Sequence, residues 1–98
     1  MSVLSVDEIT AVVKSLLRKY QAEYAILFGS YARGEATNKS DIDLLVFGGD
    51  KFIPRDIFAL AEELREICSR EADVFEIREV NRDTAFYESV LRDGIRIA

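Results

Sequence analysis

Two short apolar runs in the first half of the chain each have the length of a buried β-strand. The first covers residues 24–28 and stops at Gly29, and the second covers residues 42–47 and stops at Gly48-Gly49-Asp50. Apolar runs of about four to eight residues that end at turn residues are typical of strands buried in a sheet. The stretch between them, residues 29–41, is too polar to enter a core. The sequence therefore predicts two neighbouring strands joined by an exposed connection.

Apolar residues at helical spacing predict helices before and after these strands. Ser5 and Glu8 have the pattern of a capping box, and the periodicity that follows predicts a first helix over residues 6–21. A second helix is predicted over residues 55–70, just after Pro54. Its apolar positions, expected to share one buried face, are Ile57, Phe58, Leu60, Ala61, Leu64, Ile67 and Cys68.

The last third of the chain repeats the alternation of strand and helix. Residues 73–77 have the pattern of a third strand, and Asn81 is predicted to cap a last helix, which Gly94 ends before an apolar segment at residues 95–97. The apolar residues of that helix are Ala85, Phe86, Val90 and Leu91. This alternation predicts an α+β fold, with helices flanking one mixed sheet of three or four strands. The length of 98 residues predicts a single domain over residues 1–98.

Charge and residue usage exclude several classes of function. The net charge of -5 leaves no basic face for the phosphates of duplex nucleic acid. Histidine is absent, so Ser-His and Cys-His catalysis and a zinc site built on imidazole are excluded. The lone Cys68 is expected to be a small core residue, and no apolar run has the length of a membrane span or begins like a signal peptide. These features predict a cytoplasmic protein whose chemistry depends on carboxylates.

The chemically informative segment combines Gly29-Ser30 with Asp41-Ile42-Asp43 after a ten-residue spacer. Side chains alternate along a strand, so Asp41 and Asp43 are expected to share one face. If the first two strands pair antiparallel, Gly29 at the end of one lies beside Asp41 at the start of the next. Two like charges about 7 Å apart gain little beside an apolar run, and a divalent cation would remove the conflict. Oxygen ligands without histidine or cysteine favour Mg²⁺.

The Gly29-Ser30 pair has the features of a phosphate-binding turn. Gly29 leaves room for the close approach of a phosphate, and a short helix that begins near Ser30 would present its first N–H groups to that phosphate. The Ser30 hydroxyl adds a further donor. Arg33 lies about one turn later, where it could reach phosphate oxygens or form an ion pair with Glu35. Gly29, Ser30 and Arg33 are therefore the candidate nucleotide-binding residues.

A third carboxylate, Asp73, opens the predicted third strand. A right-handed crossover through the helix at residues 55–70 makes the second and third strands parallel, so both begin at the same end of the sheet. Asp73 can then face Asp41 and Asp43, and three carboxylates can hold two metal ions for in-line displacement at phosphorus. The alternative is that Asp73 is only an acid at the edge of a strand.

Other residues near these positions are expected to have structural roles only. Glu76 has the opposite parity to Asp73 along the strand and is expected to be solvated. Tyr31, Phe86 and Tyr87 are expected to be packing residues rather than a platform for a nucleobase.

The segment GSYARGEATNKSDIDLLVF closely resembles the signature of the DNA polymerase beta-like nucleotidyltransferase superfamily. That signature is Gly-Ser, a ten-residue spacer and Asp-x-Asp before a hydrophobic strand, and each of these positions matches. The short length, the wording Gly-Ser-x-Ala-Arg-Gly at residues 29–34 and the ending ESVLRDGIRI resemble the minimal nucleotidyltransferases, the MNT proteins. The resemblance is strong at residues 24–47 and loose after residue 71. The ending Ile97-Ala98 departs from the family because it lacks an aromatic residue.

This resemblance implies a polymerase beta-like nucleotidyltransferase fold that binds an NTP with Mg²⁺ at the Gly-Ser turn. Asp41 and Asp43 stand at the positions of the family's metal ligands, and Asp73 stands where its third carboxylate falls. The implied enzyme moves a nucleoside monophosphate, AMP from ATP, to a hydroxyl of an acceptor and releases pyrophosphate. Many MNT proteins pair with HEPN-domain partners as toxin–antitoxin systems and act as the antitoxin, so the expected partner is a HEPN-type toxin.

Two other functions stay open at this point. One is a non-catalytic antitoxin that neutralises its partner by occlusion. The other is one subunit of an enzyme that modifies a small molecule such as an aminoglycoside. Because no second domain for the acceptor is recognisable, acceptor contacts would come from another chain or from a homo-oligomer.

Overall fold

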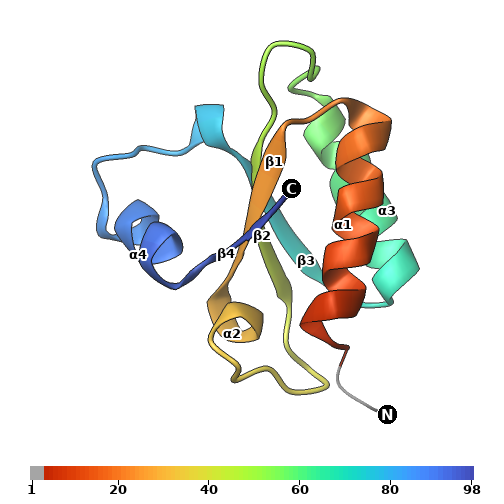
Figure 1. Ribbon diagram of the computed structural model, residues 1–98, viewed down its shortest axis with the longest axis vertical. Helices are drawn as coiled ribbons and strands as arrows, with labels where there is room; N and C mark the ends of the chain where they lie inside the picture. The colour runs from red at the N-terminus through yellow and green to blue at the C-terminus, as the bar shows by residue number, and fades with distance from the viewer. Residues whose placement is uncertain (1–3) are drawn as a thin grey trace.

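One four-stranded sheet organises the computed structural model, which describes residues 4–98 (Figure 1). Its strands are β1 (Tyr24–Phe28), β2 (Ile42–Phe47), β3 (Ala72–Glu76) and β4 (Ile95–Ile97), in the spatial order β3-β2-β1-β4. β1 pairs antiparallel with β2 and with β4, whereas β2 and β3 run parallel. The predicted mixed sheet is therefore confirmed, and so are both predicted strand pairings. Residues 1–3 of the predicted domain lie outside the described part of the chain.

Helices cover the two faces of this sheet unequally. The helices α1 (Val6–Tyr20) and α3 (Asp56–Cys68) pack against each other on one face, and α4 (Ala85–Asp93) lies on the opposite side (Figure 1). The short helix α2 (Gly29–Ala32) follows β1 directly, and a 3-10 turn (Ile77–Glu79) follows β3. Within residues 4–98, no helix is both long enough and apolar enough to cross a membrane.

Two layers of apolar side chains separate the helices from the sheet. The larger one lies beneath α1 and α3 and includes Leu44 and Val46 of β2, whereas the smaller one lies beneath α4 and includes Leu45 and Phe47. Successive residues of β2 thus alternate between the two layers, as the period of a strand requires. Cys68 is buried in the larger layer as predicted, and burial raises the pKa of its thiol.

Local signals set the start of α1 but misplace the start of α4. The Ser5 and Glu8 capping box is present, because each side chain accepts the backbone N–H of the other residue at 3.0 Å. Asn81, however, is not the cap of α4. That cap is Thr84, whose hydroxyl accepts the N–H of Tyr87. Asn81 instead uses its side chain to accept the N–H of Asp83 in the preceding turn, so the predicted cap is one turn too early.

The expected buried face of α3 is too wide. Phe58 and Ile67 were expected within it but are 77% and 57% exposed. The buried residues of the helix are Ile57, Leu60, Ala61, Leu64 and Cys68. They recur at the spacing of a single helical stripe, and Phe58 and Ile67 lie to either side of it.

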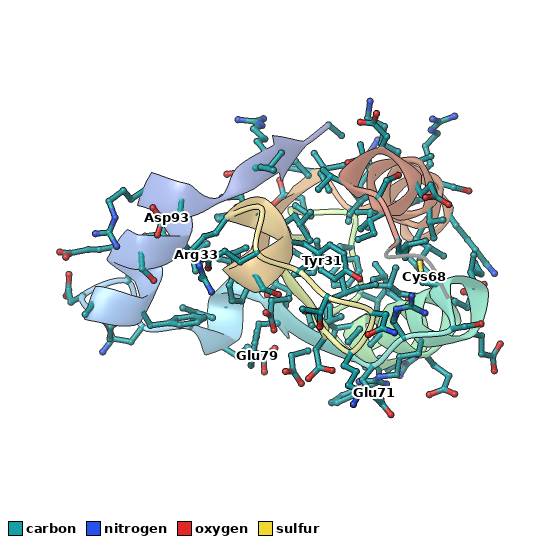
Figure 2. All side chains as sticks on the ribbon, turned by 90° about the horizontal axis from the view of Figure 1, so that it is seen from below. Tyr31, Arg33, Cys68, Glu71, Glu79 and Asp93 are labelled. Atoms are coloured by element: carbon teal, nitrogen blue, oxygen red, sulfur yellow. The ribbon has the colours of Figure 1, made fainter. Side chains whose placement is uncertain are left out.

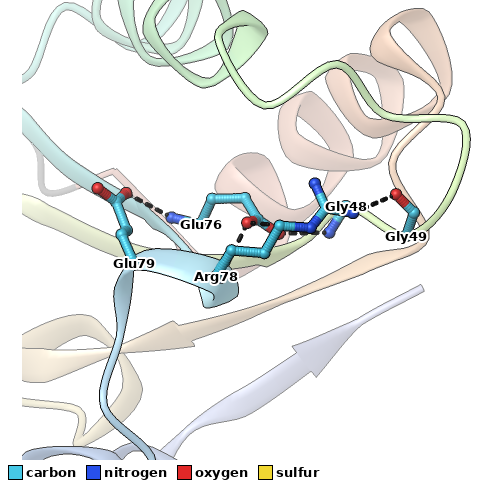
Figure 3. Close-up of polar contacts among 5 residues, drawn as sticks. All are labelled: Gly48, Gly49, Glu76, Arg78 and Glu79. Carbon is cyan, nitrogen blue, oxygen red and sulfur yellow. Dashed lines mark hydrogen bonds and ion pairs between the residues drawn. The ribbon is translucent and has the colours of Figure 1, made fainter.

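The expectation that Glu76 is solvated is wrong. Its parity turns it away from the face of Asp73, as predicted, but there the turn after β2 covers it and leaves it only 3% exposed. The Glu76 carboxylate accepts the N–H of Gly48 at 3.1 Å and the N–H of Arg78 at 2.9 Å (Figure 3). The guanidinium of Arg78 in turn donates to the carbonyl of Gly49 at 2.5 Å. Glu76 therefore ties the end of β3 to the turn that follows β2.

Glu76→Ala is expected to lower the free energy of unfolding by about 2–4 kcal/mol, because it leaves two backbone N–H groups without their buried acceptor. The matched control is Glu71→Ala, because the Glu71 side chain is 82% exposed and makes only a 3.8 Å ion pair with Arg65. The free energy of unfolding of this control should lie within about 0.5 kcal/mol of that of the unchanged protein. Urea unfolding of the three proteins measures both effects. Equal losses in the two variants would refute the structural role of Glu76.

Candidate functional site

The predicted carboxylates gather at one end of the sheet, on the face that carries α4. Asp43 in β2 stands opposite Phe28 of β1 and opposite Asp73 of β3. Leu45, two residues further along β2, belongs to the apolar layer beneath α4, so Asp43 points to the same side. Asp41 directly precedes β2 and lines the same cleft as Asp43. The expected common face of Asp41 and Asp43 is therefore observed.

A cleft of about 460 Å³ opens between α2, the start of β2 and α4. One wall consists of residues that the sequence singles out, which are Gly29, Ser30, Arg33, Asp41 and Asp43. The opposite wall belongs to α4 and presents Phe86, Ser89, Val90 and Asp93. Sequence reasoning missed this second wall. The spacing i, i+3, i+4 and i+7, which puts these four residues on one side of a helix, was the available signal.

Two observations explain why position 29 is a glycine: its backbone conformation favours glycine, and the space around it leaves no room for a side chain. Its φ of +74° is in the left-handed region, and a Cβ atom there would lie 2.1 Å from Oδ2 of Asp43. The short helix predicted near Ser30 is present as α2, which begins at Gly29. The turn therefore brings the backbone of Gly29 and the side chain of Asp43 closer together than any other residue at position 29 would allow.

Arg33 combines the two alternatives that the sequence left open. Its Nε donates to Oε1 of Glu35 at 2.7 Å, and the side chain also lines the cleft. The hydrogen bond to Glu35 raises the pKa of Arg33, and the charges of Glu35, Asp93 and Asp43 raise it further. Figure 2 shows Arg33, which directly follows α2, near Asp93, the last residue of α4. Arg33 is thus a cation held within reach of acids on both walls.

Asp43 is at the centre of the negative charge in the cleft. Partial burial raises its pKa, and the negative charges of Asp73 and Asp41 raise it further, whereas the positive charge of Arg33 lowers it. Burial and like charges both oppose the ionised carboxylate, and a single exposed guanidinium only partly offsets them. The site therefore holds negative charge for which a bound cation would be the natural complement.

Asp73 is brought near Asp43 but not into the same wall of the cleft. Its side chain is exposed and borders an adjacent hollow of about 720 Å³, which Arg65 at the end of α3 also lines. Among residues 4–98, no three acidic, histidine or cysteine side chains are grouped closely enough to hold a metal ion. Asp41 and Asp43 still fit Mg²⁺ as a pair of oxygen donors, because this ion commonly takes one or two carboxylates and completes its shell with substrate phosphates.

The predicted packing role holds for two of the three aromatic residues. Tyr31 is buried in the layer beneath α1 and α3, and Tyr87 packs against the layer beneath α4. Phe86 is 42% exposed and borders the cleft. It is therefore the aromatic residue of the three that a bound molecule can reach.

Comparisons with known proteins agree with this arrangement. The sequence pattern of the family described as "Polymerase beta, Nucleotidyltransferase" matches residues 12–98. The chain is 38% identical over 71 residues to a protein of Methanocaldococcus jannaschii that is named "Putative protein adenylyltransferase". That alignment covers 72% of this chain and 76% of the relative.

Two solved structures have the same fold. One, described as "Structure of putative minimal nucleotidyltransferase", superposes with a TM-score of 0.77 at 30% identity and covers 97% of this chain and 98% of that chain. The other contains the tri-AMPylated HEPN toxin of Shewanella oneidensis in complex with MNT antitoxin. It superposes with a TM-score of 0.71 at 21% identity, covering 94% of this chain and 71% of that chain, a level of identity that supports the fold alone.

Proposed function

Because this chain belongs to the polymerase beta nucleotidyltransferase family, we propose that it transfers AMP from ATP to a hydroxyl group of a HEPN-type toxin and thereby acts as its antitoxin. The resemblance stated from the sequence and the polymerase beta-like fold are confirmed. The observation that carries the proposal is the half-buried Asp43, which shares one face of the sheet with Asp41 and Asp73 and touches the Gly29 turn. The similarity to a protein named "Putative protein adenylyltransferase" supports AMP as the transferred group. The HEPN-type acceptor is suggested by the resemblance of the sequence to MNT proteins, and the fold shared with an MNT antitoxin is compatible with it.

The triphosphate would lie against the wall that contains Gly29, Ser30 and Arg33. The turn at Gly29 has no side chain, which lets phosphate oxygens approach its backbone, and the Ser30 hydroxyl can donate to them. Arg33 would exchange its hydrogen bond with Glu35 for phosphate oxygens, which accept guanidinium donors in the same way as a carboxylate. These three contacts orient the α-phosphate of ATP for attack.

Mg²⁺ would be held by Asp41 and Asp43 together with the substrate phosphates, whereas Asp73, which in residues 4–98 is not grouped closely enough with them to share an ion, is left for proton transfer. When bound, the ion supplies positive charge that neutralises the phosphates and steadies the leaving group. This assignment agrees with the raised pKa of Asp43, which partial burial causes first and the like charges of Asp73 and Asp41 increase. We also keep the prediction of a cytoplasmic location, where ATP and Mg²⁺ are available.

The chemical step is an in-line displacement at phosphorus. The acceptor oxygen forms a bond to the α-phosphorus, and the bond from that phosphorus to the oxygen bridging to the β-phosphate breaks. Pyrophosphate leaves with the electron pair, and Asp73 accepts the proton of the acceptor hydroxyl. The exposed side chain of Asp73 beside the cleft leaves it accessible to an acceptor carried by another chain.

The test follows a label from ATP to a purified HEPN-domain protein. Label at the α-phosphate should appear on the HEPN protein in the presence of Mg²⁺, and label at the γ-phosphate should not. Chelation of Mg²⁺ should stop the transfer. Pyrophosphate should form in equal amount to the modified protein.

Two results would contradict the proposal. Neutralisation of the HEPN protein in cells without any transferred label would favour an antitoxin that acts by occlusion. Label found on an added aminoglycoside but on no protein would favour a subunit of a small-molecule nucleotidyltransferase.

A further inference from the structure

The α4 wall of the cleft differs chemically from the wall with the Gly29 turn. It presents Phe86, Ser89, Val90 and Asp93, and none of these side chains is a cation. The negative charge of Asp93 would repel phosphate groups, whereas Arg33 on the other wall would attract them. A nucleoside triphosphate therefore fits this cleft in one orientation, with its phosphates on the α2 wall and its nucleoside on the α4 wall.

Phe86 is held in place at the edge of the cleft by two other aromatic rings. Its ring centroid lies 5.4 Å from that of Phe28 and 6.0 Å from that of Phe75, and both pairs have an edge-to-face arrangement. The side chain is nevertheless 42% exposed. Edge-to-face packing fixes the orientation of a ring without covering both of its faces. Phe86 is thus an ordered aromatic side chain with surface left for a ligand.

The space beyond Phe86 is partly apolar. A second hollow of about 270 Å³ lies on its far side, next to Phe75, Val80 and Thr84, and Glu79 and Asn81 also line it. Phe86 therefore lies between the charged cleft and this depression, which precedes α4. A planar group at this position would contact the Phe86 ring and the apolar side chains next to it.

We propose that Phe86 is the stacking platform for the base of the nucleoside triphosphate, an inference that rests on the proposed nucleotidyl transfer. Aromatic side chains bind bases through stacking, which every nucleobase can supply. The polar groups on the same wall match the nucleoside as well. The Ser89 hydroxyl donates to the carbonyl of Phe86 at 2.7 Å, so it offers acceptor lone pairs, as the Asp93 carboxylate does. Ribose hydroxyls and a base amino group are the corresponding donors.

The experiment compares two probes, ATP and inorganic tripolyphosphate, each titrated with Mg²⁺ into the full chain by calorimetry. Tripolyphosphate has the phosphates but no nucleoside, so it reports the α2 wall alone. Phe86→Ala should weaken ATP binding about 10-fold and change tripolyphosphate binding less than about 2-fold, because base stacking is lost and phosphate contacts are kept. The matched control is Leu91→Ala, since Leu91 is another exposed apolar residue of α4, 54% exposed, that does not line the cleft. It should leave both affinities unchanged.

A second variant keeps the proposal testable if Phe86→Ala folds poorly. The chain contains no tryptophan, so Phe86→Trp introduces a single indole at the proposed platform. ATP should quench the fluorescence of that indole and tripolyphosphate should not. The stacking role would be overturned by equal weakening of both probes in Phe86→Ala, by unchanged ATP affinity, or by equal quenching. If neither probe binds the unchanged protein, the proposed nucleotide site itself fails, a result distinct from the loss of discrimination at Phe86.

Discussion

Asp43→Asn is expected to remove nucleotidyl transfer and, in the same protein, to stabilise the metal-free fold at neutral pH. The carboxylate is the central anion of the cleft, and replacing it removes one of the two proposed Mg²⁺ ligands. Losing several kcal/mol of charge stabilisation in the transition state corresponds to a fall of about 10³-fold or more in the rate. The gain in stability has a separate cause, since a neutral amide avoids the desolvation penalty that partial burial imposes on an ionised carboxylate and also the repulsion from Asp73 and Asp41.

The pH dependence of this gain in stability follows from the direction in which the pKa of Asp43 is shifted. The pKa of Asp43 is raised above its ordinary value of 3.8, so the folded chain binds the proton more tightly than the unfolded chain. Ionised Asp43 therefore opposes folding, and stability declines as the pH rises from 3.8 through the raised pKa. An Asn side chain at position 43 does not ionise and therefore does not lower the stability in this way. The advantage of Asp43→Asn is expected to be full at neutral pH and to vanish below pH 3.8.

Rates of label transfer and urea unfolding in the presence of a chelator measure the two effects. The control is Asp50→Asn, which removes an exposed acid from the turn after β2 and should change neither quantity. A variant that kept its transfer rate would exclude Asp43 as a metal ligand. A variant less stable than the unchanged chelated protein at neutral pH would show instead that the carboxylate is stabilising.

Gly29→Ala is expected to damage both the fold and the site, and Gly34→Ala separates the two effects. Both glycines have left-handed backbones, with φ of +74° at Gly29 and +72° at Gly34. Each substitution should therefore lower the free energy of unfolding by about 1–2 kcal/mol through backbone strain. A Cβ at Gly34 would meet no atom within 4 Å, whereas one at Gly29 would lie 2.1 Å from Oδ2 of Asp43.

Only the change at Gly29 is therefore expected to displace Asp43. Transfer should fall about 10²-fold or more in Gly29→Ala, because a shift of about 1 Å in a positioning group can have this effect. It should stay near the unchanged rate in Gly34→Ala at a temperature where both variants are folded. The affinity for Mg²⁺-ATP, measured by calorimetry, should likewise fall more in Gly29→Ala than in Gly34→Ala. Equal losses of activity in the two variants would attribute the effect to backbone strain rather than to the contact with Asp43.

The parts of the fold that the sequence predicts well depend on neighbours in the chain. The capping box at Ser5 and Glu8, the strands beside Gly29 and Ile42, and the parity that puts Asp41 and Asp43 on one side are properties of a few consecutive residues. The spacing between Gly29-Ser30 and Asp41 was informative for the same reason. When a strand ends at Gly29 and the next one begins near Asp41, antiparallel pairing puts these two residues side by side. These signals were sufficient for the mixed sheet and for one wall of the cleft.

The tertiary structure alone decided how distant segments cover one another. Glu76 became buried because the turn after β2 closes over it, and Phe58 stayed exposed because no element packs on that side of α3 within residues 4–98. The second wall of the cleft depends on the packing of α4 against β1. These two segments are more than fifty residues apart in the chain. Local patterns determined which residues form the first wall of the cleft, whereas long-range packing, which no local period encodes, determined what faces them.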